Sequence, residues 1–226
     1  MSEQMTEQMT EMEAIRARHS VRKYQNKKLE PSVASRLRAM LDACNEQGEL
    51  HLQLLENPGD TFGTVFARLS GLNSAPAAIA CIGPDDETLE ERIGYWGEKA
   101  VLFAQTLGLN TCWVGMHKKE GCPAQIRDGE KLVIVIAVGY GKDAGRSRRS
   151  KTAEQVCPGV ANAPDWFRAG IEAALLAPTA VNQQRFTFSL EDDGKVTSVA
   201  GVGPHSKVDL GIVRYHFDVA AAEARK

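Results

Sequence analysis

Residues 132–138 read LVIVIAV, and this uninterrupted apolar run is the strongest strand signal in the chain. A strand that does not alternate with polar residues is typical of burial on both faces, which predicts a central position in a sheet. The polar loop 139–151 follows it and ends in the basic run RSRRSK at 146–151. A basic loop at the carboxyl end of a central strand is a usual position for a ligand's anionic group. The alternative is an exposed charge run.

The elements around this strand predict an α+β fold. Pro31 suits the first turn of a helix, Gly108 suits the position just after one, and Pro76 suits the start of a strand. The apolar spacing predicts helices over 12–18, 31–44, 93–107, 163–176 and 210–224, and strands over 50–55, 75–82 and 185–190.

Bulk composition favours an ordinary globular enzyme. The 226 residues carry a formal net charge of -2, and 43% of them are hydrophobic, so no overall charge favours nucleic acid or a membrane surface. The five cysteines are widely spaced and odd in number, which argues against a disulfide framework or a zinc site and favours a reducing cytoplasm. The start MSEQMTEQMTE lacks the features of a signal peptide, and no apolar stretch reaches membrane-spanning length.

The segment 18–22 reads RHSVR. Extended residues alternate sides, so Arg18, Ser20 and Arg22 can converge on one anion. Arginine binds phosphate through a planar fork that stays charged. A solvated basic turn is the alternative interpretation.

Two further segments offer groups that suit a flat heterocycle. Residues 177–184 read APTAVNQQ, and their hydroxyl and amide groups can donate and accept hydrogen bonds. Residues 107–116 read LGLNTCWVGM, and Gly115 would let a planar ring approach the backbone. Each segment by itself is also consistent with a plain loop or core packing.

Internal repetition is visible in two pairs of helices. Residues 37–43 resemble residues 167–173, and Ile93-Gly94 resembles Leu210-Gly211. We therefore predict two half-sized α+β units that pack like a dimer: 12–152 and 153–226, after a flexible N-terminus 1–11. Residues 45–48, NEQG, would be a degenerate counterpart of the loop at 177–184.

Taken together, these segments resemble the FMN-dependent nitroreductase family. RHSVR at 18–22 resembles its N-terminal phosphate and ribityl clamp, and APTAVNQQRF at 177–186 resembles its Pro-Ser-x-x-Asn-x-Gln-Pro-Trp loop. That loop normally follows soon after the clamp and is supplied by the partner in an intertwined homodimer. Here it comes much later, as in a rarer branch that holds both halves in one chain. Arg185 and Phe186 replace the usual Pro-Trp.

The resemblance implies non-covalent FMN, with NAD(P)H delivering hydride to it and a small acceptor taking the electron pair. It assigns no side chain as a catalytic acid or base, and it assigns no metal. It implies a cytoplasmic enzyme that is a monomeric pseudo-dimer or a homodimer, and leaves NADH or NADPH open. The implied cofactor-binding residues are Arg18, His19, Ser20, Arg22, Val114, Gly115, Arg148, Arg149, Lys151, Pro178, Thr179 and Asn182.

Two other functions remain open at this point. A flavin-binding sensor or carrier would share the clamp but turn over little substrate. A binding module without flavin could use the basic loops for RNA or an acidic partner, although no aromatic residues are interleaved with those charges.

Overall fold

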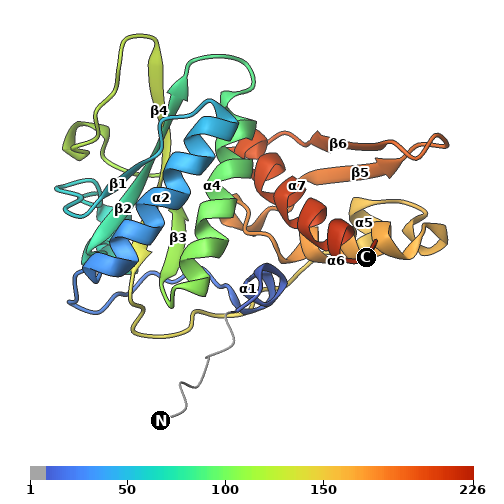
Figure 1. Ribbon diagram of the computed structural model, residues 1–226, viewed down its shortest axis with the longest axis horizontal. Coiled ribbons are helices and arrows are strands. Elements are labelled where there is room, and N and C mark those ends of the chain that lie inside the picture. Colours follow the sequence, from blue (N-terminus) through green and yellow to red (C-terminus); the bar gives the residue numbers. More distant parts are fainter. Residues whose placement is uncertain (1–8) are drawn as a thin grey trace.

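The computed structural model describes residues 9–226, and the fold is α+β as predicted (Figure 1). The helices are α1 (Glu11–Ala17), α2 (Pro31–Gly48), α3 (Val65–Ser70), α4 (Leu89–Thr106), α5 (Ala153–Val156), α6 (Asp165–Leu176) and α7 (Ser206–Glu223). The strands are β1 (Gln53–Leu55), β2 (Ala77–Pro84), β3 (Asn110–Val114), β4 (Glu130–Gly139), β5 (Phe186–Leu190) and β6 (Val196–Ala200). Short 3-10 turns complete it: Leu72–Ser74, Lys119–Gly121, Val160–Asn162 and Ala180–Asn182.

Most of the flexible segment predicted at 1–11 lies outside the described residues. Where the described part begins, Thr10 already caps α1, because its side chain and that of Glu13 form a reciprocal capping box. The helix begins at Glu11, one residue earlier than an N-terminal segment ending at residue 11 would allow.

The main sheet has the strand order β1-β2-β4-β3, and all its pairs are antiparallel. The apolar run 132–138 forms the body of β4, and every residue of it is buried, as predicted. On one face, Ile79 and Ile136 pack with the helices α2 and α4. On the other face, Ala80 and Val135 pack with Val21 of the N-terminal segment. The sheet is thus covered on both sides.

A second, two-stranded sheet pairs β5 with β6 and packs beside α7. Its inward aromatic residues meet those of α6 and α7: the Phe188 and Phe217 rings stack with centroids 5.0 Å apart, and Phe167 meets Phe217 edge to face at 5.3 Å. Figure 1 shows this hairpin on the side of α7 that faces away from the main sheet. Neither α3 nor β6 is among the predicted elements.

Helices α4 and α7 cross at two glycines. A side chain at Gly94 would lie 2.0 Å from the Val208 carbonyl oxygen, and one at Gly211 would lie 2.0 Å from the Glu91 carbonyl oxygen. The two contacts are reciprocal, because each glycine faces a residue three positions before the other. Only glycine permits this backbone approach.

Residues 45–48 are a correction to the prediction. They form the last turn of α2 and no loop. Asn45 accepts a hydrogen bond from the Leu52 amide at 2.6 Å and donates one to the Leu52 carbonyl at 3.0 Å, so its amide ties the helix end to the start of β1.

All five cysteines are free. Within residues 9–226, no helix combines the length and the apolar character that crossing a bilayer requires.

Candidate functional site

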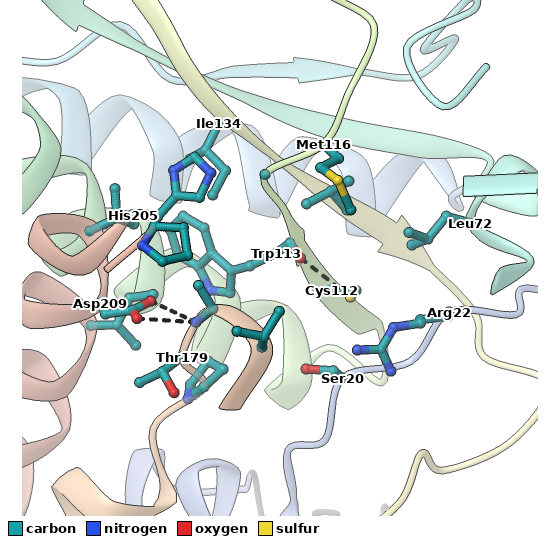
Figure 2. A pocket seen from close by; sticks show the side chains of 18 of the residues that line it. Ser20, Arg22, Leu72, Cys112, Trp113, Met116, Ile134, Thr179, His205 and Asp209 are labelled. Atoms are coloured by element: carbon teal, nitrogen blue, oxygen red, sulfur yellow. Dashed lines mark hydrogen bonds between the residues drawn. The ribbon is translucent and has the colours of Figure 1, made fainter. Parts of the chain in front are cut away.

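Two adjoining cavities share part of their lining: an apolar one between the main sheet and the start of α7, and a basic one between the N-terminal segment and the loops 143–148 and 178–182. The apolar cavity has a volume of about 320 Å³, and the basic cavity next to it has a volume of about 580 Å³. Residues of both linings come from segments far apart in the sequence, and the two linings share Ser20, Arg22, Pro178, Thr179 and Val181. Figure 2 shows the apolar cavity with Arg22 and Ser20 at one end and His205 and Asp209 at the other.

The N-terminal segment enters the site as an extended strand along β3. The Val21 amide donates to the Thr111 carbonyl at 3.0 Å, and Ser20 forms a parallel bridge with Thr111. Val21 is completely buried, so alternation turns Ser20 and Arg22 toward the cavities. Arg18, which was predicted to converge with them, lines neither cavity.

Arg18 lies apart from both linings. It follows α1 directly and is 3% exposed. Its Nε lies 3.7 Å from the Glu98 carboxylate, and no guanidinium nitrogen finds a hydrogen-bond partner among residues 9–226. Burial lowers the pKa of Arg18, while Glu98 acts in the opposite direction.

Glu98 is the centre of a buried polar cluster. Its carboxylate accepts a hydrogen bond from Trp113 Nε1 at 2.8 Å and lies 2.9 Å from His216 Nε2. The other ring nitrogen of His216 is 3.1 Å from the Ala173 carbonyl. The cluster joins α1, α4, α7 and β3, and Trp113 carries it to the wall of the apolar cavity.

His19 is also outside both linings. His19 packs against Gly145: a Cβ placed on Gly145 would lie 2.6 Å from the Cβ of His19. Burial lowers the pKa of His19, and the nearby positive charges of Arg18 and Arg148 lower it further.

The basic loop contributes two arginines to the basic cavity, Arg146 and Arg148. Arg148 donates to the carbonyls of Leu176 and Ala177, where α6 ends. Burial lowers the pKa of Arg148 to about 10. The guanidinium therefore caps a helix end while it faces the cavity that Arg22 enters.

The other two predicted cations of this loop do not line either cavity. Lys151 Nζ donates to the Gln184 carbonyl at 2.6 Å, which turns it toward the later loop. Arg149 is exposed, and its carbonyl accepts a hydrogen bond from Asn182 Nδ2 at 2.9 Å. Both residues therefore form hydrogen bonds to the loop 177–184 and stabilise its position.

That loop forms the shared edge of the two cavities. Pro178 and Thr179 line both of them, and Asn182 lines the basic one. Thr179 Oγ1 accepts a hydrogen bond from the Gln184 amide at 3.1 Å. Val181 and Asn182 have positive φ values of 45° and 55°, a conformation that few side chains adopt without surrounding constraints.

Asp209 helps to hold the loop 177–184 in this conformation. Nothing in the local sequence pattern indicates that Asp209 has this role. Both of its carboxylate oxygens accept hydrogen bonds from the Ala180 amide, at 2.9 and 3.1 Å, and one also accepts from Gln183 Nε2 at 2.7 Å. Asp209 lies in the first turn of α7. It therefore ties the loop to this helix.

We expect the stability of the protein to depend on pH through Asp209. Burial raises the pKa of Asp209 to about 6, against the hydrogen bonds from Gln183 and Ala180. The folded state then binds this proton more tightly than the unfolded chain does. Raising the pH from 4 to 7 should therefore lower the free energy of unfolding by about 2 to 3 kcal/mol through this one group.

Urea unfolding of the wild type and of Asp209→Asn at both pH values checks this expectation, because the variant cannot ionise at this position. The free energy of unfolding of the variant should fall less between pH 4 and pH 7. Parallel changes in the two proteins would contradict it.

Val114 and Gly115, two of the predicted cofactor-binding residues, line the apolar cavity. The space that Gly115 leaves open is filled, however, by a side chain of this protein. A Cβ at Gly115 would lie 2.4 Å from His205 Nε2. The glycine therefore admits an imidazole to this end of the cavity.

A model of the family described as "Putative TM nitroreductase" matches residues 10–221. The match spans nearly the whole chain. The chain belongs to the nitroreductase family. This membership makes it an oxidoreductase by family.

Solved structures of nitroreductases share its fold. A "putative nitroreductase" of Thermotoga maritima is 21% identical with a TM-score of 0.68, and the alignment covers 99% of this chain and 90% of that one. A "Putative NADH dehydrogenase/NAD(P)H nitroreductase" of Parabacteroides distasonis is 20% identical with a TM-score of 0.51, and the alignment covers 65% and 95%. A nitroreductase family protein of Streptococcus pneumoniae is 13% identical with a TM-score of 0.51, and the alignment covers 65% and 98%. None of the curated proteins compared with the chain matches it.

Several residues that line the apolar cavity are absent from the prediction. Trp113 and Met116 lie within a segment that was singled out, and their apolar side chains next to Gly115 are the signal that could have found them. Asp209 and His205 carry no such signal, because only the packing of α7 against the loop brings them to the cavity.

Proposed function

We propose that this chain is an FMN-dependent oxidoreductase that passes electron pairs from NAD(P)H through the flavin to a small acceptor. The observation that carries the proposal is the shared edge of the two cavities. A ligand with a dianionic end and a flat apolar end could occupy both at once, and FMN has this shape and charge.

The basic cavity suits the phosphate end. Arg22, Lys23, Arg146 and Arg148 line it, against the single carboxylate of Asp143. Arg22 is exposed, and Arg148 Nε is buried without a partner among residues 9–226. Guanidinium groups on two sides favour a phosphate, because each can form paired charge-assisted hydrogen bonds. The Ser20 hydroxyl adds a donor at the boundary.

The apolar cavity suits the ring end. Trp113, Ile134, Val208 and Ile212 give it apolar walls, which exclude water and strengthen electrostatic interactions within. Pro178, Thr179, Ala180 and Val181 of the later loop line one edge of this cavity. Bound FMN would supply the two-electron redox chemistry there, and the residues of the chain hold, orient and desolvate it.

The rim of the apolar cavity carries exposed apolar side chains. Phe66, Met116 and Val181 line it and remain 47%, 58% and 88% exposed. Exposed apolar groups at a cavity mouth are typical of a binding site for planar molecules. We assign this mouth to the nicotinamide donor and the acceptor, which would use it in turn.

The proposal includes an internal duplication. The elements α2, β1, β2 and α4 recur in order as α6, β5, β6 and α7, with an antiparallel pair of strands in each set. The reciprocal contacts of Gly94 and Gly211 support it, because an interface with twofold symmetry has this self-complementary pattern. Residues 45–48, which stand where the repeat would place a second copy of the loop 177–184, are the last turn of α2, so one pseudo-dimer would hold one flavin.

An absorption spectrum of the purified protein, with FMN added back, tests the cofactor. Mixing the holoprotein with NADH or NADPH in a stopped-flow instrument tests the enzyme, because a competent flavin loses its visible absorption on reduction. Failure to bind FMN would favour a binding module without flavin. Bound flavin that neither nucleotide bleaches would favour a sensor or carrier.

We expect Arg22→Ala to raise the Kd for FMN about 10- to 100-fold, because a charge-assisted hydrogen bond contributes roughly 1.5 to 3 kcal/mol. Quenching of FMN fluorescence on binding measures it. Arg16→Ala is the matched control, since Arg16 is exposed on α1 and lines neither cavity. Equal affinities for FMN in the two variants would contradict the assignment of Arg22.

A further inference from the structure

The apolar cavity contains one imidazole with no assigned role. His205 precedes α7, and its side chain does not cap that helix. Figure 2 shows the ring within the cavity, beside Asp209 and away from Arg22. Its place at the end remote from the basic cavity puts it near the ring and acceptor region of the proposed function.

Two backbone features together bring this ring into the cavity. His205 has a φ of 52°, in the left-handed region that non-glycine residues seldom adopt. Gly115, opposite it, lacks the side chain that would meet Nε2 at 2.4 Å. Strained backbone that aims one side chain into a ligand cavity is a reason to ask what that side chain does.

The other titratable groups of the apolar cavity are engaged or lie elsewhere. Asp209 accepts hydrogen bonds from Ala180 and Gln183. Cys112 is 4% exposed, and its thiol faces the Trp113 carbonyl. Arg22 lies at the boundary with the basic cavity. Asp209 can also exchange a proton, but its carboxylate oxygens are already hydrogen-bonded to the loop 178–184. Among the described residues, His205 is the remaining titratable lining group, its side chain has no such bond to the loop, and it is therefore the candidate to pass a proton to a bound acceptor.

We propose that His205 is a catalytic residue that donates a proton to the electron acceptor. This inference rests on the proposed function, which supplies the electron pair. Reduction of a quinone to a hydroquinone adds two electrons and two protons. One hydride equivalent reaches one oxygen, the imidazolium of His205 gives its proton to the other oxygen, and the imidazole regains a proton from water at the cavity mouth. Histidine suits this role because it exchanges protons near neutral pH.

The test compares the rates of reduction of two acceptors, one that must take up protons with its electrons and one that takes up electrons alone. The prereduced holoprotein is mixed with 1,4-benzoquinone or with ferricyanide, which takes up electrons without protons. His205→Asn removes the imidazole, and asparagine tolerates the left-handed backbone. We expect this variant to reduce benzoquinone about 100-fold more slowly, which is a typical loss of general acid catalysis. Its rate with ferricyanide and its bleaching by NADH or NADPH should stay at the wild-type values.

His51→Asn is the matched control. The His51 ring lies 2.8 Å from the Glu130 carboxylate, and His51 lines neither cavity. It should retain the wild-type rate with both acceptors. His205→Gln should repeat the result of His205→Asn, which guards against an effect of asparagine itself on the fold.

Three outcomes would overturn the inference. A wild-type benzoquinone rate in His205→Asn, with bleaching intact, would remove His205 alone from the mechanism. Equal losses with benzoquinone and ferricyanide would show a structural role. Absence of bleaching in the wild type would overturn the proposed function itself and the role of His205 with it.

Discussion

Replacing Glu98 by glutamine should lower the free energy of unfolding by about 3 to 5 kcal/mol, because it breaks a buried ion pair by removing one partner. Glu98 is fully buried, and so is His216, while Arg18 is 3% exposed. The amide of the variant could still accept from Trp113 Nε1. The Arg18 guanidinium, however, would lose the only carboxylate within 4.0 Å of it among residues 9–226.

Urea unfolding followed by tryptophan fluorescence measures this loss. Glu30→Gln is the control, because Glu30 forms an exposed pair with Lys27 at 2.8 Å, and exposed pairs contribute about 0 to 1 kcal/mol. Adding Arg18→Met to Glu98→Gln should restore part of the stability, since no buried charge then remains uncompensated at Arg18. Similar small losses for Glu98→Gln and Glu30→Gln would show that the cluster does not stabilise the fold.

We expect Gly211→Ala to destabilise the protein by about 3 kcal/mol, through overpacking at the helix crossing. At an exposed helical position this change would be favourable by about 1 kcal/mol. In α7 the new methyl group would lie 2.0 Å from the Glu91 carbonyl and 2.6 Å from the Tyr95 amide nitrogen. Backbone atoms cannot rotate away, so α4 and α7 would have to move apart.

Thermal and urea unfolding of Gly211→Ala give the magnitude and sign. Ala222→Gly is the control, because Ala222 is exposed near the end of the same helix. It should cost about 1 kcal/mol, the usual preference for alanine over glycine. A stabilised Gly211→Ala would show that the helices do not need this close approach.

The sequence predicts the long elements of the fold well. The buried strand β4 and the helices α2, α4, α6 and α7 lie within a few residues of their predicted positions, because apolar periodicity depends on local burial alone. The short elements α3 and β6 escape prediction. Residues 65–70 expose Val65 and Leu69 to 74% and 84%, so α3 lacks the pattern of a buried face.

The site was predictable in outline and less so in its contacts. Ser20, Arg22, Pro178 and Thr179 line the cavities because each lies in a short segment whose direction follows from extended or turn geometry. The irregular loop at 146–151 has no fixed alternation, so the sequence could not show that Arg148 faces the cavity and Lys151 does not. Asp209 and His205 depend on how α7 docks, which is a long-range property.

Both cavities take their walls from one polypeptide, since Arg22 and the 178–182 loop belong to the same chain. A ligand that spans them would be held by segments whose encounter is intramolecular and independent of protein concentration. For a site that one chain holds alone, serial dilution at fixed free ligand would leave site occupancy constant. A pocket assembled from separate subunits would instead empty as those subunits dissociate.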